Sequence, residues 1–303
     1  MYDFIGDIHG HADQLEKLLS KLGYSNSGGT YSLPGRKAFF VGDYIDRGPD
    51  IKKTLEIVKS MVDSGNAIAL LGNHEYNALC FHAKKPGGCH LRKHSIKNMV
   101  QHYETIKQFH NHEKEFEVYL DWFKTLPIFY ENENFRAVHA AWDRFSIIYL
   151  KQHLVNGCLT DDLLVESSSK GSLLRDAIEI TLKGKEIKMP DPHTFPDKDG
   201  TSRKEIRIKW WNNPKTTTYR EISIEPLDVL PDTILEPSNF TNLDYYQEED
   251  KPVFFGHYWL KGNPYLYRNN ICCLDYSVAK KGHLVAYRFD GEVTLDPKKF
   301  IYV

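Results

Sequence analysis

The sequence predicts an α/β fold in which polar residues gather at one edge of a parallel sheet. Short apolar runs at 2–6, 37–42 and 67–71 alternate with segments of helical periodicity, which is typical of strand–helix units. Each run stops at a polar motif that contains glycine. The motifs are Gly6-Asp7-Ile8-His9-Gly10, Gly42-Asp43-Tyr44-Ile45-Asp46-Arg47-Gly48 and Gly72-Asn73-His74-Glu75. Ligands bind at the carboxyl ends of strands in such sheets, so these motifs mark a candidate site.

The helices between the first strands are indicated by their apolar stripes. Leucines at helical spacing predict a helix that ends at Gly23, and a stripe from Ile51 to Val62 predicts another that ends at Gly65. A third helix is expected to begin near Asn73. These elements account for the first half of the sheet.

The rest of the chain continues the same domain with two interruptions. A helical insertion is expected at about 84–126, and an irregular one, dense in proline, glycine and charge, at about 160–250. Between them we expect strands at 127–131 and 135–140 and a helix at 142–156. Strand signals return at 253–256, 271–274 and 284–287, with a last strand around 293–295 after a turn at Asp290-Gly291. A second sheet on the first, within a single domain of residues 1–303, is the simplest interpretation.

Composition restricts the functional classes. The 303 residues are 41% hydrophobic and 26% charged with a net charge of −2, which is typical of a globular protein and offers no basic field for a nucleic-acid polymer. No run of 18 apolar residues and no signal peptide is evident, so neither a membrane span nor classical secretion is expected. Five cysteines without framework spacing fit a reducing compartment. We therefore expect a cytoplasmic protein, although secretion without a cleaved signal would leave no such trace.

The polar motifs contain the ligand types that divalent metal ions prefer. Asp7 and His9 are two apart, which on an extended segment places both side chains on one face. Asp43 could bridge two ions, and Asn73 offers a neutral oxygen.

Two further histidines, His139 and His257, end later apolar runs. A lone histidine at a strand end is usually a satisfied polar residue, but six candidate ligands at the same end of strands are not explained in that way. They indicate a two-metal phosphoesterase with ions about 3.5–4 Å apart.

These residues resemble the calcineurin-like metallophosphoesterase superfamily. The three motifs are similar to those of its serine/threonine phosphoprotein phosphatase branch, which also contains bacterial diadenosine tetraphosphate hydrolases. The resemblance covers residues 2 to about 145 and resumes near 252. It implies a four-layer α/β/β/α sandwich.

The resemblance also implies roles for individual residues. The first metal would be bound by Asp7, His9 and Asp43, and the second by Asp43, Asn73, His139 and His257. His74 would protonate the leaving oxygen, Asp46 would orient His74, and Arg47 would clamp the phosphoryl oxygens. The cofactors would be two divalent ions, Mn²⁺ by preference, with Fe or Zn²⁺ also compatible with these ligands.

General chemistry supports the same roles. Two cations that share a water lower its pKa, so that a metal-bound hydroxide can attack phosphorus directly. A histidine paired with a carboxylate can supply the leaving group's proton, and a planar guanidinium can bind two phosphoryl oxygens at once.

Two features depart from the family pattern. Ala140-Ala141 follows His139 where relatives carry glycine, which reduces backbone freedom beside that ligand. A second phosphate-binding arginine is expected between the two late histidines, and Arg203 and Arg207 are the candidates. The alternative is that both are solvated cations packed over Trp210 or Trp211. The residues expected to contact substrate are therefore Arg47, Asn73, Arg203 and Arg207.

Other sequence signals are weaker. Tyr258 and Trp259 could stack on a nucleobase, as could Trp210, but filling the core is the commoner use of such residues. Cys80-Phe81-His82 and Cys89-His90 match no standard zinc spacing.

Three functions remain open from the sequence. The first is hydrolysis of a phosphomonoester or a phosphoprotein, and the alternative is cleavage of a dinucleoside polyphosphate such as diadenosine tetraphosphate. In both cases the partner is a phosphorylated substrate. The third is an inactive binding module, which is disfavoured because the acid, the arginine and every ligand type are present.

Overall fold

The computed structural model of the 303-residue chain describes residues 1–190, 192–196, 202–236 and 244–303. Parts of the predicted insertion at 160–250 therefore lie outside the described residues. Within the described ranges, no helix is both long and apolar enough to cross a bilayer.

The first sheet contains the three strands predicted at the N-terminal end. Its order is β14(Asp275–Tyr276), β15(His283–Phe289), β1(Tyr2–Ile5), β4(Lys37–Phe40) and β5(Ala67–Ala69), and β16(Phe300–Tyr302) also pairs with β15. β1, β4 and β5 are parallel, whereas β15 runs antiparallel to β1. The carboxyl ends of β1, β4 and β5 therefore meet at one edge.

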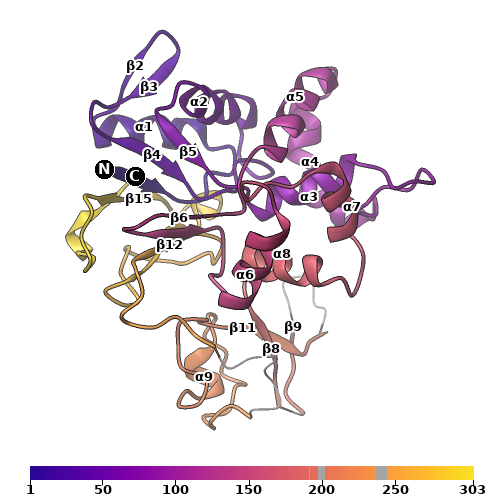
Figure 1. The fold of residues 1–303 in the computed structure, drawn as a ribbon, viewed down its shortest axis with the longest axis vertical. Coiled ribbons are helices and arrows are strands. Elements are labelled where there is room, and N and C mark those ends of the chain that lie inside the picture. Colours follow the sequence, from indigo (N-terminus) through magenta and orange to yellow (C-terminus); the bar gives the residue numbers. More distant parts are fainter. Residues whose placement is uncertain (191, 197–201, 237–243) are drawn as a thin grey trace.

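Helices cover one face of this sheet, as Figure 1 shows for α1(Ala12–Leu22) and α2(Ile51–Asp63). Both bury an apolar stripe, and Gly23 ends α1 in the left-handed conformation. Ile5 and Phe40 point into this helical core. Their neighbours Phe4 and Phe39 point to the opposite face, as the alternation of a strand requires.

A second sheet packs against that opposite face. Its order is β13(Ile271–Cys273), β12(Val253–Phe255), β7(Arg136–Val138) and β6(Phe129–Glu131). Phe4 and Phe254 stack between the two sheets with ring centroids 3.7 Å apart, and Phe135 meets Phe4 edge-on at 4.9 Å. The aromatic layer joins the sheets into one core.

The outer face of the second sheet is covered by α6(Arg144–His153) and α8(Leu173–Lys183), with α7(Asp161–Ser167) beside α8 (Figure 1). Ile147 and Ile180 pack from these helices onto the same core as β12. The layers are thus helices, sheet, sheet, helices, and the predicted four-layer α/β/β/α sandwich is confirmed.

The helical insertion contains two helices rather than one continuous run. α3(Asn73–His82) follows β5, and α4(Ile96–Gln108) and α5(Glu113–Lys124) come after a loop at 83–95. Phe116 and Phe123 pack from α5 into the helical core. The insertion therefore places α4 beside the motif that begins α3.

The predicted irregular insertion at about 160–250 begins with α7 and α8, which belong to the outer helical layer. Its later part forms a small unit with its own core, which lies at the bottom of Figure 1. Its elements are β8(Glu186–Lys188), β9(Phe195–Pro196), β10(Ser202–Arg203), β11(Glu205–Arg207) and α9(Tyr219–Ile222). A separate hairpin, β2(Ser25–Ser27) and β3(Thr30–Ser32), follows α1.

The prediction of a strand around 293–295 is wrong. In the fully described segment 244–303, these residues form a loop, and the last strand is β16, which follows the 3₁₀ turn Pro297–Lys299. Val293 is 84% exposed, so it has no sheet face to cover. β16 instead pairs with β15 over Tyr287↔Phe300 to Val285↔Tyr302.

We predict that Phe254→Ala lowers the free energy of unfolding by about 3–5 kcal/mol, because it leaves a cavity between the two sheets. Phe145→Ala is the control, since Phe145 is 57% exposed on α6 and should change that free energy by less than about 0.5 kcal/mol. Urea unfolding measures both. Equal losses would contradict the position assigned to the aromatic layer.

Candidate functional site

The six residues predicted to bind metal come together where the strands of both sheets end. Asn73 Oδ1 lies 2.7 Å from His257 Nδ1 and 3.0 Å from His139 Nε2. Asp43 Oδ1 is 3.4 Å from His139 Nε2, and Asp43 Oδ2 is 3.6 Å from His9 Nε2.

Asp7 completes the cluster by accepting a hydrogen bond from the His257 amide at 3.0 Å. A side chain at Gly256 would place its Cβ 1.9 Å from Asp7 Oδ1, so glycine is required for this approach. The second sheet thus reaches the first sheet's motif through backbone contact.

Asp43 is shared by two groups of possible ligands. One group is His9, Asp43 and His74, and the other is Asp43, His139 and His257, with ligand atoms within 4.8 Å of one another in each. The first group contains His74 where the sequence analysis expected Asp7. Among the described residues, neither group contains a cysteine, so the discounted zinc motif does not join them.

The backbone at the site is turned rather than extended. β1 ends at Ile5, and His9 has φ +49°, so the expected extended geometry between Asp7 and His9 is wrong. Asp43, Asp46 and His257 also have positive φ, at +57°, +86° and +74°. Each such conformation costs about 1–3 kcal/mol and persists only where neighbouring contacts enforce it.

Glu75 supplies much of that enforcement, and the sequence analysis assigned it no role. Its carboxylate accepts backbone hydrogen bonds from Asp43 (2.9 Å), Tyr44 (2.8 Å), Ile45 (3.3 Å) and Gly72 (3.1 Å). It is fully buried. The signal was its place in the motif that begins α3, three residues after Gly72, where a glutamate can reach back to the helix start.

His74 is held by Asp46, as predicted for an oriented histidine, although its role in a reaction stays a prediction. His74 Nδ1 lies 2.6 Å from Asp46 Oδ2, which leaves Nε2 facing the cluster. Burial lowers the pKa of His74, but Asp43 and Asp46 together raise it above its usual value.

Asp46 has a second histidine partner that sequence reasoning missed. His102 Nδ1 lies 2.6 Å from Asp46 Oδ1, and the Thr105 hydroxyl donates to the same oxygen at 2.7 Å. Both residues come from α4, so the helical insertion fixes Asp46. Their spacing of three on one helix face was the available signal.

Arg47 is exposed beside the cluster and contacts Trp259. Its guanidinium carbon lies 5.4 Å from the Trp259 ring centroid, and Lys280 Nζ lies 3.9 Å from that centroid. Among the described ion pairs, none joins Arg47 to Asp46 or Asp50, the alternative for a loop arginine. Asp275, another residue missed from the sequence, accepts the Trp259 amide at 2.7 Å.

Arg203 and Arg207 lie near the cluster but do not touch the predicted ligands through any described bond. With Tyr258 and Trp259 they line a hollow of about 350 Å³. Arg207 also forms an ion pair with Glu186, with Nε and Oε1 3.3 Å apart.

Trp210 and Trp211, over which the alternative would place these arginines, are both buried. Trp210 is 3% exposed and donates its indole N–H to the Ala140 carbonyl at 3.1 Å, which favours the core-filling alternative over base stacking. Ala140 and Ala141 donate their backbone amides to Thr181, which accommodates the departure from glycine.

Residues 2–258 match the family model for calcineurin-like phosphoesterases. The chain belongs to this family. The match includes β1, β4 and β5 of the first sheet, β6, β7 and β12 of the second, the helical insertion and all six predicted metal ligands.

The curated relatives that match this chain have names that refer to a dinucleoside tetraphosphate. The chain is 32% identical over 140 residues to a bis(5'-nucleosyl)-tetraphosphatase PrpE [asymmetrical] of Oceanobacillus iheyensis, which covers 46% of this chain and 54% of that protein. It is 48% identical over 73 residues to the PrpE of a Geobacillus species, covering 24% of this chain and 30% of that protein. The chain thus spans about half or less of the curated relatives it matches.

A solved structure shares the fold. A protein serine/threonine phosphatase from Saccharomyces cerevisiae with similarity to human phosphatase PP5 aligns with 100% of this chain and 78% of its own, at 12% identity and a TM-score of 0.50. At this identity the likeness concerns the fold alone.

The calcineurin-like phosphoesterases use a dinuclear metal site, and the buried atoms here fit one. Within the described chain, Asp7 Oδ1, His9 Nε2 and His257 Nε2 are buried without a hydrogen-bond partner. Such atoms are costly unless something binds them. Burial, together with the charges of Asp275 and Asp43, raises the pKa of Asp7 well above normal, which is the repulsion that bound cations would relieve.

Two of the histidines suit metal binding in their neutral form. Burial lowers the pKa of His9 to about 3, and burial followed by the charge of Arg207 lowers that of His257 well below normal. Neutral imidazole is the form that coordinates metal. Proton competition at these two positions is therefore weak at neutral pH.

We predict that Asp43→Asn reduces the number of bound Mn²⁺ ions, because it removes the charge common to both ligand groups. Equilibrium dialysis followed by metal analysis measures the number of Mn²⁺ ions bound per protein. Asp63→Asn, at an exposed ion pair with Lys59, is the control and should leave it unchanged. Two tightly retained ions in Asp43→Asn would contradict the shared position.

Proposed function

We propose that this chain is a metal-dependent phosphoric ester hydrolase that uses two divalent ions, with Mn²⁺ the first to test. Asp7, His9 and Asp43 would hold one ion, and Asp43, Asn73, His139 and His257 the other. The observation that carries the proposal is the shared position of Asp43 between two ligand groups, with His74 beside it. Bound ions would lower the pKa of the attacking water.

His74 would act as the general acid. The attacking water would first release a proton to solvent and attack as hydroxide. As its oxygen bonds to phosphorus, the ester P–O bond breaks, its electron pair stays on the leaving oxygen, and the Nε2 proton of His74 passes to that oxygen. Asp46 fixes the ring through Nδ1, so Nε2 carries the transferable proton. The charges of Asp43 and Asp46 raise the pKa of His74, which favours its acid form.

Arg47 would bind the phosphoryl oxygens, on which charge accumulates. It is exposed at the edge of the cluster and is positioned by the Trp259 ring rather than by a carboxylate among the described residues. A guanidinium with free donors can engage two phosphoryl oxygens. Asn73, beside both late histidines, would face the same group.

For the substrate, we propose a dinucleoside polyphosphate ahead of a phosphoprotein. The names of the PrpE relatives support this class. The hollow of about 350 Å³ beside Trp259 supports it too, because it combines aromatic rings with Arg203 and Arg207. Cations and rings together suit a nucleotide.

We predict that His74→Asn lowers kcat about 10²–10⁴-fold on alkyl phosphates, whose leaving groups need a proton, and less on p-nitrophenyl phosphate. Wild-type kcat on alkyl phosphates should fall as pH rises through the raised pKa of His74, above the usual value of about 6.5, since only the protonated ring donates. The variant should lose this dependence. Stopped assays across pH 5–9 measure both.

The control for this series is His153→Asn, because His153 is exposed on α6. It should keep wild-type rates. Equal losses of His74→Asn on both substrates, with metal content unchanged, would contradict the general acid.

We predict that the Mn²⁺-loaded protein cleaves diadenosine tetraphosphate with higher kcat/KM than phosphoserine, phosphothreonine or phosphotyrosine peptides. Chromatography of products and phosphate release measure the two classes, and Asp43→Asn is the inactive reference. Preference for a peptide would contradict the proposed substrate class but not the proposed reaction. Hydrolysis of neither by the metal-loaded protein would contradict the reaction.

A further inference from the structure

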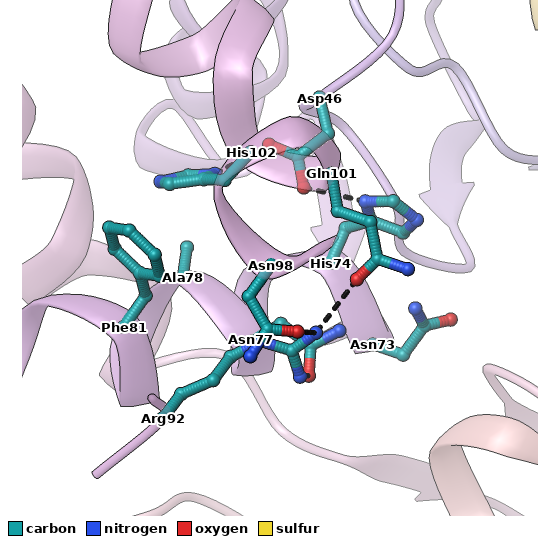
Figure 2. Close-up of a pocket in the computed structure, with 10 residues that line it drawn as sticks. All are labelled: Asp46, Asn73, His74, Asn77, Ala78, Phe81, Arg92, Asn98, Gln101 and His102. Atoms are coloured by element: carbon teal, nitrogen blue, oxygen red, sulfur yellow. Dashed lines mark hydrogen bonds and ion pairs between the residues drawn. The ribbon is translucent and has the colours of Figure 1, made fainter. Parts of the chain in front are cut away.

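A small polar cavity lies beside His74 and Asn73. Its volume is about 60 Å³, and it is lined by residues of α3, α4 and the loop between them, with Asp46 at its edge. Figure 2 shows Arg92 reaching from that loop toward Asn77, Asn98 and Gln101, with Asn73 and His74 opposite. A space of this size admits a few waters or one small anion.

Arg92 is a partly buried cation held only by neutral groups. Its guanidinium donates to Asn77 Oδ1 at 2.6 Å, to Asn98 Oδ1 at 2.9 Å and to Gln101 Oε1 at 2.8 Å. In the described part of the chain, no carboxylate lies within ion-pair distance of it. Carboxamides orient the cation without neutralising it, so its charge remains available.

The other groups at the cavity also favour an anion. Because Asn77 and Gln101 accept from Arg92 through oxygen, their NH₂ groups remain as donors, and neither makes a hydrogen bond to another described residue. Asp46 is the carboxylate among the lining residues, and His74 and His102 both engage it at 2.6 Å. Donors therefore dominate the cavity.

We propose that this cavity, with Arg92 at its centre, binds a phosphate group of the leaving group. The inference rests on the proposed function and deepens it. The leaving oxygen must lie at His74, and His74 and Asn73 form one wall of the cavity. Because Arg92 lines the same cavity, a phosphate attached to that oxygen would lie within reach of its guanidinium. A phosphate there is the feature that separates an anhydride substrate from a phosphomonoester.

Arg92 could instead serve only to tie the 83–95 loop to α3 and α4. The two roles differ in what they change. Loss of a purely structural role would lower the stability of the protein and the kcat/KM for every substrate alike. Loss of an anion subsite would lower kcat/KM only for substrates whose leaving group carries a phosphate.

Three variants separate these roles. Arg92→Gln removes the charge. Gln101→Glu keeps the size and places a carboxylate against Arg92, which neutralises the cation while retaining the contact. Lys93→Gln is the matched control, because Lys93 is the neighbouring cation, is exposed and does not line the cavity.

The measurement is kcat/KM of Mn²⁺-loaded protein for diadenosine tetraphosphate divided by that for p-nitrophenyl phosphate. We expect Arg92→Gln and Gln101→Glu to lower this ratio about 10- to 100-fold and Lys93→Gln to leave it unchanged. Thermal unfolding checks that each variant is folded. If Arg92→Gln does not fold, the ratio measured for Gln101→Glu tests the subsite by itself.

An unchanged ratio in folded variants would overturn the subsite and leave the proposed function intact. A wild-type protein that cleaves only p-nitrophenyl phosphate would overturn the subsite and the nucleotide class together. If neither substrate is cleaved, the proposed function fails. Calorimetric binding of inorganic pyrophosphate to the metal-loaded protein then tests the subsite, with weaker binding expected for Gln101→Glu and equal binding overturning it.

Discussion

The site depends on the buried carboxylate of Glu75. By accepting amide hydrogen bonds from Asp43, Tyr44, Ile45 and Gly72, it joins the loop after β4 to the start of α3. Asp43 in turn accepts the His74 amide at 3.0 Å, so the two loops hold each other. A left-handed Asp43 would be unfavourable in a free loop, and this exchange of hydrogen bonds compensates for it. The positions of Asp43, Asn73 and His74 all follow from it.

The same hydrogen bonds hold several carboxylates close together in a buried place. Asp7, Asp43 and Asp275 are buried within a single cluster. Burial is the largest cause that raises the pKa of Asp7 and of Asp275, and repulsion by neighbouring carboxylates raises both further. Bound cations would relieve that repulsion, so metal binding would stabilise the fold. The second sheet takes part through His139 and His257, which explains why a two-sheet sandwich, rather than one sheet, surrounds the cluster.

The sequence predicted the parts of the fold and site that depend on short-range pattern. Apolar runs that end in Asp7, Asp43, Asn73, His139 and His257 located the strand ends, because a strand and its polar end are contiguous in sequence. The partners of those residues could not be found in that way. His102 reaches Asp46 across 56 residues, and the neutral environment of Arg92 depends on how α4 packs on α3. The prediction of a strand at 293–295 failed because a turn signal such as Asp290-Gly291 cannot show where the next strand begins or whether a sheet face is available to cover.

The packing of Trp259 has an optical consequence. Of the five tryptophans, four are buried, and Trp259 is the one that is partly exposed. Its indole lies beside Arg47 and Lys280 and stacks near His9, with ring centroids 5.4 Å apart. Any ligand that draws Arg47 away changes the charge next to this indole and leaves the other four unaffected. The protein therefore carries an intrinsic fluorophore at the mouth of its site, and its emission can report occupancy without a label.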